Sequence, residues 1–172
     1  TGVQGVFFAA SVPGFGASIF TIDIATSGDV ECARRPTPVT KGPAVLENDA
    51  VALQIDENGF VSKLLDKVSN MSTALRLGYG LYEKVQGGAY SMVETQPSTA
   101  QPKLNLESLV SGPVFSEATF SNQKGNPGIK QVLRVASASD SPLVRVTNEL
   151  LQPNPLQTEL TAEYMTDLQN DG

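Results

Sequence analysis

Residues 45–67 of this chain read V-L-E-N-D-A-V-A-L-Q-I-D-E-N-G-F-V-S-K-L-L-D-K. Between residues 51 and 55, Val, Leu and Ile alternate with Ala and Gln, which is the period-two pattern of a half-buried strand. The sequence Asp56–Gly59 follows, and Asn and Gly tolerate the positive φ angles that a tight turn needs. A second strand-like run, Phe60–Leu65, leads to another turn signal at Asp66-Lys67. The stretch therefore predicts a β-hairpin.

The rest of the chain repeats this pattern of short apolar runs separated by turn residues. Asn122–Gly128 (N-Q-K-G-N-P-G) is the strongest turn signal, and Ser72–Leu77 allows at most one short helical turn. No segment has the pattern of a longer amphipathic helix. We therefore predict an all-β fold, an antiparallel β-sandwich. The further strands are expected near Tyr79–Val85, Ala89–Glu94, Leu104–Val110, Val114–Ser121, Ile129–Val135, Leu143–Leu151 and Thr158–Thr166.

The chain is expected to divide at a proline-rich stretch near its N-terminus. Residues 26–43 contain Pro36, Pro38 and Pro43 and show no apolar periodicity, so they are interpreted as a linker. Residues 1–25 carry two strand-like runs and are predicted to be strands of a preceding small β-domain. Residues 44–172 are predicted to form the sandwich.

Composition and charge exclude several classes of function. The chain has 12 basic and 18 acidic residues and a net charge of −6, whereas nucleic-acid binding requires clustered Lys and Arg. No apolar run approaches the roughly 20 residues of a membrane-spanning helix. We therefore expect neither a nucleic-acid partner nor a membrane span. The chain begins without Met and without the layout of a signal peptide, which favours a fragment or a processed piece.

The chain contains no His and a single Cys, Cys32. His is the usual general base and the commonest metal ligand, so a His-based triad is impossible within this chain. A zinc site made only of Cys32 and carboxylates is not expected. Cys32 cannot close a disulfide on itself, which leaves an exposed thiol or a bridge to another chain.

The segment Asn70-Met71-Ser72 matches the N-glycosylation sequon and follows a predicted strand. It predicts a glycan on Asn70 and a secretory route. Two acidic residues further on, Glu159 and Glu163, fall on one face of a predicted strand. We interpret them as outward-facing, solvated charges rather than catalytic groups.

Several segments, in consistent order, resemble the family 38 α-mannosidases of the lysosomal type. The start of that family's large β-sandwich is similar to three parts of the hairpin region, which are Leu46–Asn48 before the hairpin, its turn and the Asp-Lys that follows. The similar segments are Phe7–Ile22, Leu46–Asn48 (L-E-N), Asp66-Lys67, Gly87–Tyr90 (G-G-A-Y), Ser111–Glu117 (S-G-P-V-F-S-E), Ile129–Arg134 and Glu159–Asp167 (E-L-T-A-E-Y-M-T-D). The resemblance implies that the sandwich is part of a galactose-mutarotase-like supersandwich.

The resemblance also implies an activity for the parent enzyme. Retaining glycosidases use one carboxylate as nucleophile and a second as acid and then base. In this family the nucleophile and the zinc ligands lie in an N-terminal α/β domain that these 172 residues do not contain. The implied chain is a non-catalytic C-terminal β-domain segment or processed subunit of a zinc-dependent α-mannosidase acting on N-glycans. No catalytic residue and no bound metal are then expected in the chain itself.

Tyr90 is the residue that the resemblance places at the substrate, where the family's Gly-Ala-Tyr hydroxyl contacts the sugar. Ser91–Glu94 depart from the apolar residue and Phe-x-Pro that follow this Tyr in the family. An ordinary strand position for Tyr90 therefore stays open. Tyr79 and Tyr82 are further candidates for a sugar-facing set, with a core role as their default interpretation.

The partners implied are the catalytic domain or other processed chains of the same enzyme, together with a mannose-containing glycan. The implied location is the secretory pathway, in a lysosome, a vacuole or outside the cell. An alternative class of protein remains possible, which is a stand-alone carbohydrate-binding or adhesive β-module without hydrolase activity. Such a module would need its own solvent-facing aromatic residues. A purely structural domain is the third interpretation.

Overall fold

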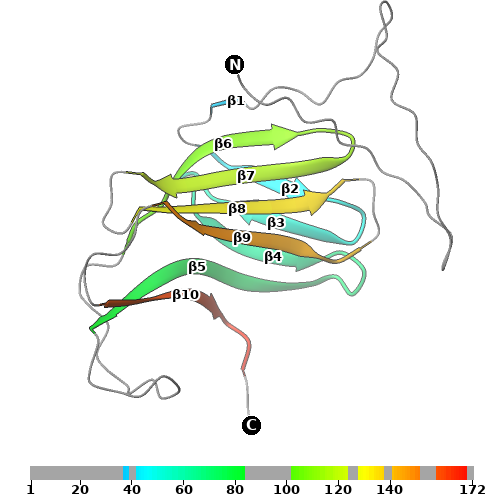
Figure 1. Cartoon of the computed structure of the whole chain (residues 1–172). Helices are drawn as coiled ribbons and strands as arrows, with labels where there is room; N and C mark the ends of the chain where they lie inside the picture. The colour runs from blue at the N-terminus through cyan, green and yellow to red at the C-terminus, as the bar shows by residue number, and fades with distance from the viewer. Residues whose placement is uncertain are drawn as a thin grey trace, which may run out of the picture.

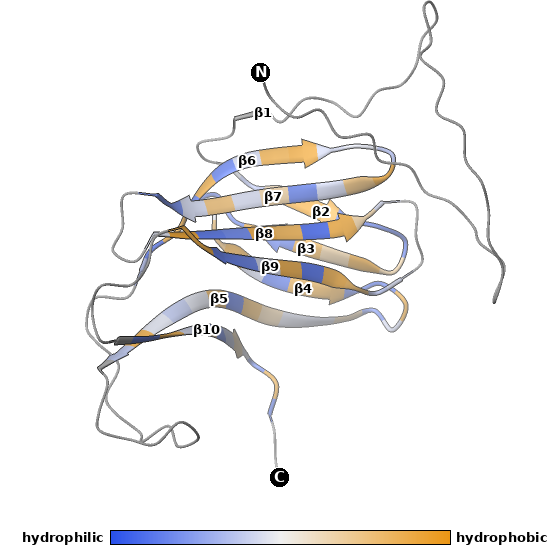
Figure 2. Cartoon of the chain, in the orientation of Figure 1, coloured by the Kyte–Doolittle hydropathy of each residue, from blue (hydrophilic) through white to orange (hydrophobic). Residues whose placement is uncertain are grey.

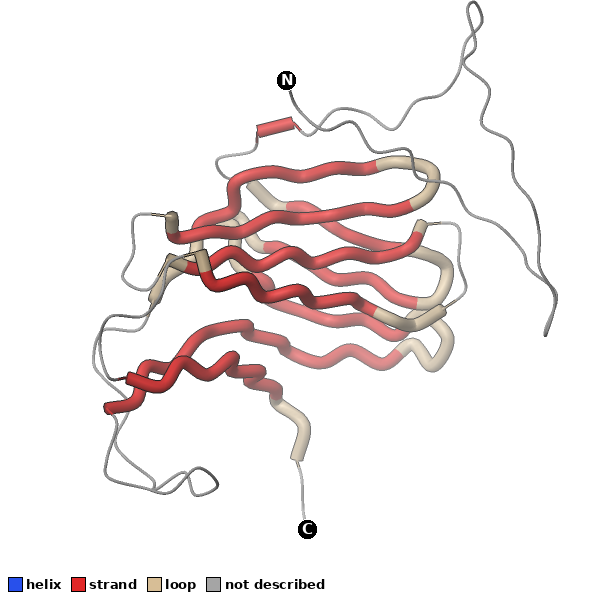
Figure 3. Tube along the Cα trace, viewed as in Figure 1, coloured by secondary structure: helices blue, strands red, loops and turns tan. Residues whose placement is uncertain are grey.

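The computed structural model describes residues 37–38, 42–83, 102–123, 128–137, 141–151 and 158–169. These residues form strands, turns and loops and no helix (Figure 3). The strands are β1 (Thr37–Pro38), β2 (Ala44–Glu47), β3 (Val51–Ile55), β4 (Val61–Asp66), β5 (Met71–Glu83), β6 (Asn105–Ser111), β7 (Phe115–Asn122), β8 (Ile129–Ala136), β9 (Val144–Leu150) and β10 (Thr158–Thr166). Most of them fall where the sequence predicts strands. The predicted strands before residue 25 and at Ala89–Glu94 lie outside the described residues, as do Cys32 and Tyr90.

The strands form two five-stranded sheets that face each other (Figure 1). One sheet has the order β1-β6-β7-β8-β9 and the other β10-β5-β4-β3-β2. Every neighbouring pair is antiparallel. The predicted all-β antiparallel sandwich is thus confirmed. Within the described residues no helix is long and apolar enough to cross a membrane.

The hairpin that the sequence marks most clearly is β3–β4. Leu53 pairs with Leu46 on β2 and with Leu64 on β4, so three leucines share one row across the sheet. The Asp56 carboxylate closes the turn by accepting hydrogen bonds from the backbone N–H groups of Asn58 and Phe60, both at 2.9 Å. Gly59 has φ 82°, a conformation that glycine adopts without steric cost.

The core lies between the two sheets and takes alternate residues from each. Figure 2 shows apolar and polar residues interspersed along β8 and β9, as expected for strands with one buried face. Burial of each large aliphatic side chain contributes about 1.5–3 kcal/mol to folding. The cluster of buried residues comprises Leu46, Val51, Leu53, Ile55, Val61, Leu106, Ala118, Phe120, Leu133 and Val135.

Asn48 links the first strands to the opposite sheet. Its Oδ1 accepts hydrogen bonds from the backbone N–H groups of Ala50 and Val51, at 2.9 and 2.8 Å. Its Nδ2 donates to the carbonyl oxygens of Ala136 and Ser141, at 3.1 and 2.9 Å. Asn48 is 6% exposed, so this amide is a fully paired buried group.

Glu47, the residue before Asn48, forms a 2.7 Å salt bridge with Lys67. The Leu-Glu-Asn and Asp-Lys segments therefore have structural roles in this chain.

Strand β5 changes partner along its length. Met71–Ala74 pairs with β4, whereas Leu75–Glu83 pairs with β10. The short helical turn that the sequence allowed over Ser72–Leu77 is absent, because the ladders with β4 and β10 take up these residues in extended conformation. The β5–β10 pair thereby continues the second sheet past the end of β4 (Figure 1).

The stretch interpreted as a linker also contributes to the sandwich. Thr37 and Pro38 form β1, which pairs with Leu109 and Ser108 of β6. A proline is tolerated there because β1 is the last strand of its sheet, where one edge needs no ladder hydrogen bond.

Candidate functional site

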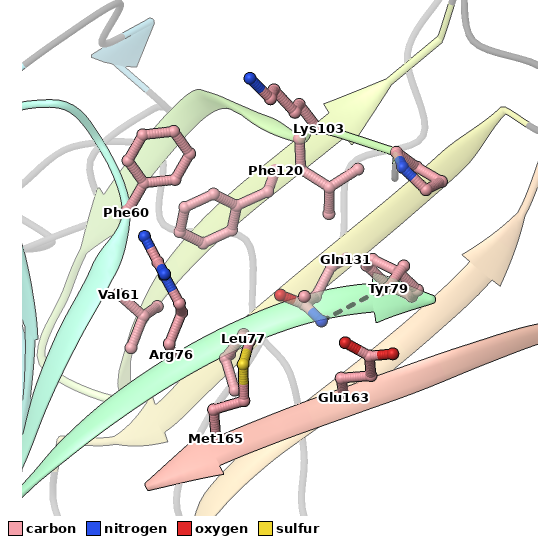
Figure 4. Close-up of a pocket in the computed structure, with 13 residues that line it drawn as sticks. Phe60, Val61, Arg76, Leu77, Tyr79, Lys103, Phe120, Gln131, Glu163 and Met165 are labelled. Carbon is pink, nitrogen blue, oxygen red and sulfur yellow. Dashed lines mark hydrogen bonds between the residues drawn. The ribbon is translucent and has the colours of Figure 1, made fainter. Parts of the chain in front are cut away.

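A pocket of about 440 Å³ opens between the β5–β10 pair and the facing strands β7 and β8 (Figure 4). Its volume falls in the range of small-molecule sites, roughly 300–1,000 Å³. It lies beside the part of β5 that pairs with β10 rather than with β4. The lining residues are Phe60, Val61, Arg76, Leu77, Gly78, Tyr79, Pro102, Lys103, Leu104, Phe120, Gln131, Glu163 and Met165.

A polar triad joins three strands at one wall of the pocket. The Tyr79 hydroxyl of β5 donates to Oδ1 of Asn148 on β9 at 2.6 Å. Gln131 Nε2 of β8 donates to the Tyr79 oxygen and to Asn148 Oδ1, both at 3.0 Å. Tyr79 and Gln131 are only 3% and 4% exposed. The triad therefore satisfies buried polar groups and fixes the side chains of two pocket residues.

Burial raises the pKa of Tyr79 to about 12, while the hydrogen bond from the Gln131 amide opposes the shift. Burial disfavours the charged phenolate because the site offers less solvation than water. Tyr79 is therefore neutral at physiological pH, and its proton stays engaged with Asn148. Tyr79 therefore has a structural role in the wall of the pocket and does not act as an acid or a base.

A second polar pair, Tyr82 and Glu163, lies on the β5–β10 ribbon. The Tyr82 hydroxyl donates to Glu163 Oε1 at 3.2 Å, and this bond raises the pKa of Tyr82. Gly80 lies between them, and a Cβ there would overlap the Glu163 carboxylate and the Tyr82 ring. The missing side chain at residue 80 thus leaves room for the pair.

The structure differs from the expectation that Glu163 faces solvent. Glu163 is half-buried and lines the pocket together with Met165, while Tyr164 between them is 53% exposed. Period-two alternation along β10 places residues 163 and 165 on one face. The β5–β10 register places Glu163 opposite Gly78 and Met165 opposite Arg76, and all four residues line the pocket.

The rim of the pocket combines aromatic and charged side chains. Phe60 is 49% exposed, whereas Phe120 is 4% exposed and belongs to the core. Arg76 and Lys103 supply cationic groups and Glu163 an anionic one. The lining therefore has apolar surfaces with hydrogen-bond donors and acceptors of both charge signs.

The predicted modification site, Asn70, lies in the β4–β5 turn and is not among the residues that line the pocket. Asn70 is exposed, has φ 55°, and ends the β4–β5 turn. Asp66 Oδ1 holds the turn by accepting from the backbone N–H groups of Val68 and Ser69, and its Oδ2 accepts from the Ser69 hydroxyl at 2.7 Å. The Ser69 bonds lower the pKa of Asp66. Ser72 of the sequon is also exposed, so the folded chain leaves space for a glycan there.

The sequence-based candidates and the observed pocket overlap only in part. Tyr79 lines the pocket, but its hydroxyl and that of Tyr82 are occupied by protein partners. Gln131 and Arg76 were not predicted as site residues. The signal for Gln131 was its place in the inward-facing series Ile129, Gln131, Leu133 and Val135, where a polar residue among buried apolar ones is unusual.

The part of the chain that the structure describes contains no group of three or more His, Cys, Asp or Glu side chains suited to a metal ion. Zinc prefers four such ligands, or three and a water. The described residues therefore do not fit a zinc site.

Residues 46–172 match the model of the glycosyl hydrolases family 38 C-terminal domain. The chain belongs to this family. The match covers the hairpin, the core and all residues that line the pocket. No curated protein and no solved structure matches the chain.

Membership of the family 38 C-terminal domains confirms the resemblance at the level of the family. It also accounts for the all-β architecture, since both sheets lie almost entirely within the matched residues. A C-terminal domain of a family 38 glycosidase is a non-catalytic part that implies a catalytic partner domain and a glycan substrate. The pocket described above is a feature of this domain itself.

Proposed function

We propose that this chain is the non-catalytic β-domain, or a processed β-subunit, of a zinc-dependent retaining α-mannosidase of the lysosomal type. Its substrates are α-mannosides of N-glycans. The observation that carries the proposal is the match of residues 46–172 to the family 38 C-terminal domain. The sandwich would brace the catalytic domain and close one side of the sugar cleft.

The acidic residues of the described part support a scaffolding role. Asp56 and Asp66 close turns, Glu47 pairs with Lys67, and Glu117 contacts Arg134 at 2.5 Å. Carboxylates held in this way stabilise strands and turns. A retaining enzyme needs two carboxyl groups about 5–5.5 Å apart across the glycosidic bond, with freedom to attack and to exchange a proton. In this proposal the catalytic partner domain supplies both, and it also supplies the zinc ligands.

Tyr90 is the residue of this chain that we propose to contact the substrate, through its hydroxyl. A tyrosine suits a sugar pocket because its rigid ring packs against C–H groups while its hydroxyl both donates and accepts. A secretory, lysosomal or vacuolar location follows from the same proposal. The exposed Asn70 sequon supports that location.

Native mass spectrometry of the protein isolated from its source tests the proposal. We expect the 18.2 kDa chain to be found in a complex with a larger, zinc-containing chain. The same preparation should hydrolyse p-nitrophenyl α-mannopyranoside. The chain alone should have no activity. The subunit role would be contradicted if the chain is found alone while the α-mannosidase activity of the preparation is found in fractions that lack it. That result would instead support a stand-alone carbohydrate-binding or structural module.

A matched pair of variants tests the role of Tyr90 in the assembled enzyme. Tyr90→Phe removes one hydroxyl contact to the sugar and should reduce kcat/KM by roughly tenfold, the effect of losing about 1.4 kcal/mol of transition-state binding. Tyr164→Phe removes a hydroxyl from an exposed ring and should leave kcat/KM unchanged. Equal activity of both variants would remove Tyr90 from the sugar site.

A further inference from the structure

We propose that the pocket between β5, β8 and β10 binds a neutral pyranose ring, so that this domain holds a sugar unit with its own residues. The glycan class of the ligand rests on the proposed function. The site itself rests on the chemistry of four lining residues, which are Gln131, Phe60, Arg76 and Glu163. None of them was singled out as a binding residue by the sequence.

Gln131 supplies a hydrogen-bond acceptor at the wall of the pocket. Both hydrogen bonds that the structure gives its amide are donated by Nε2, to Tyr79 and to Asn148. Figure 4 shows the amide oxygen directed away from Tyr79, and no donor among the described residues bonds to it. A side chain that is 4% exposed and whose amide is fixed by its neighbours presents this oxygen in one orientation. A ligand hydroxyl can donate to this oxygen in place of water.

The aromatic side of the pocket suits the C–H face of a sugar ring. Phe60 is half-exposed at the turn before β4, and Phe120 lies deeper on β7. Figure 4 shows both rings on the same side of the pocket as Arg76. A flat ring with an apolar face and polar edges can pack against phenyl groups while its hydroxyls reach polar side chains.

The charged residues favour a ligand that both donates and accepts hydrogen bonds. Glu163 is an acceptor and Arg76 a donor, and both line the same space as the Gln131 oxygen. A purely apolar ligand would leave the Gln131 oxygen without a partner, which costs free energy on desolvation. An anion would face Glu163, and a cation would face Arg76 and Lys103. A neutral ring with several hydroxyls meets all of these requirements.

Titration of the purified 172-residue chain with methyl α-mannopyranoside tests the proposal, with NMR detection of the Gln131 side-chain amide. We expect saturable shifts of that amide. Cyclohexanol, which has a similar ring with one hydroxyl, and acetate, which is an anion, should shift it at least tenfold less at equal concentration. Methyl β-glucopyranoside reports whether the pocket distinguishes one pyranose from another, and any pyranoside that binds supports the site.

Two variants make the test specific. Phe60→Ala removes a half-exposed ring, so it should fold normally and weaken pyranoside binding by roughly tenfold. Leu143→Ala truncates a 71% exposed side chain outside the pocket lining and should bind as the unmodified chain does. Absent shifts with pyranosides, unaltered binding by Phe60→Ala, or equal binding of cyclohexanol would each overturn the proposal. These outcomes leave the subunit test unaffected, because that test depends on the partner chain rather than on the pocket.

Discussion

The hydroxyl of Tyr79 on β5 donates a 2.6 Å hydrogen bond to Oδ1 of Asn148 on β9, and this bond connects the two sheets of the sandwich. It occurs where β5 has left β4 and pairs only with β10. Gln131 on β8 reinforces it by donating to both partners. The two sheets are therefore held together at the pocket by polar contacts, whereas the region over β2 and β3 is closed by aliphatic packing.

Removing the Tyr79 hydroxyl should lower the stability of the domain. Tyr79→Phe keeps the buried ring but deletes the bond to Asn148 and one acceptor of Gln131, so we expect a loss of about 1–2 kcal/mol in the free energy of unfolding. Urea denaturation followed by circular dichroism measures it. Tyr164→Phe is the matched control, because its ring is 53% exposed, and it should change stability by less than about 0.5 kcal/mol. Equal effects would mean that the triad contributes nothing.

The same tyrosine predicts a loss of stability at alkaline pH. Its pKa is about 12 in the folded chain, against about 10 for an unfolded tyrosine. The unfolded state therefore releases this proton first as the pH rises. The contribution to stability is fully present below pH 10 and is lost between about pH 10 and 12. Denaturation midpoints measured across that window should fall less steeply for Tyr79→Phe than for the unmodified chain. Parallel curves would contradict a buried, neutral Tyr79.

Asn48 should be among the most sensitive polar positions. Asn48→Ala removes four hydrogen bonds and leaves the N–H groups of Ala50 and Val51 buried without this acceptor. We expect a loss of roughly 3 kcal/mol in the free energy of unfolding. Asn105→Ala on β6 is the control, because Asn105 is exposed, and it should cost less than about 0.5 kcal/mol. A small effect at residue 48 would show that water or backbone movement replaces these bonds.

Asn70 should carry an N-glycan when the chain is secreted from eukaryotic cells. The sequon ends an exposed turn, and the left-handed conformation of Asn70 is one that asparagine tolerates better than most residues. Ser72→Ala is therefore the better test, because it removes the sequon and keeps the residue with φ 55°. We expect an endoglycosidase-sensitive mass difference in the unmodified chain that Ser72→Ala abolishes. An unmodified chain of the bare peptide mass would refute the site.

The sequence predicts most of the fold because the strands are short and their burial is one-sided. Along β8 the series Ile129, Leu133 and Val135 is buried, as period-two alternation requires. The same rule could not show that β5 continues from Met71 to Glu83. Its first half has little apolar alternation and is extended because β4 and β10 supply ladder partners. Such partners are distant in sequence, so a local pattern does not reveal them.

The site was harder to predict for the same reason. The sequence predicts Glu163 as a solvated charge, since a strand pattern gives the shared face but not the residues that this face contacts. Gln131 was visible as a polar residue in a buried series, yet its partners Tyr79 and Asn148 lie 52 and 17 residues away. The pocket brings together residues of β5, β7, β8 and β10, and that arrangement is set by sheet pairing rather than by local sequence.

Two glycines on β5 provide a direct test of how closely the β5–β10 ribbon is packed. A Cβ at Gly80 would overlap the Glu163 carboxylate and lie 2.7 Å from the Tyr82 ring and 2.9 Å from the Thr161 hydroxyl. At Gly78 the nearest atom would be Met165 Cε at 3.5 Å, an ordinary contact. We therefore expect Gly80→Ala to destabilise the chain by roughly 1–3 kcal/mol, the usual cost of overpacking.

Gly78→Ala should instead be neutral or stabilise the chain by about 0.5 kcal/mol, because alanine loses less backbone entropy than glycine in a strand. Thermal unfolding of the two variants at neutral pH measures the difference. Gly80→Ala should also break the hydrogen bond between Tyr82 and Glu163, so the pKa of Tyr82 should move back towards its ordinary value, as measured by tyrosinate absorbance. If both variants unfold at the same temperature, the carboxylate moves aside without cost, and Gly80 is not needed for the pair.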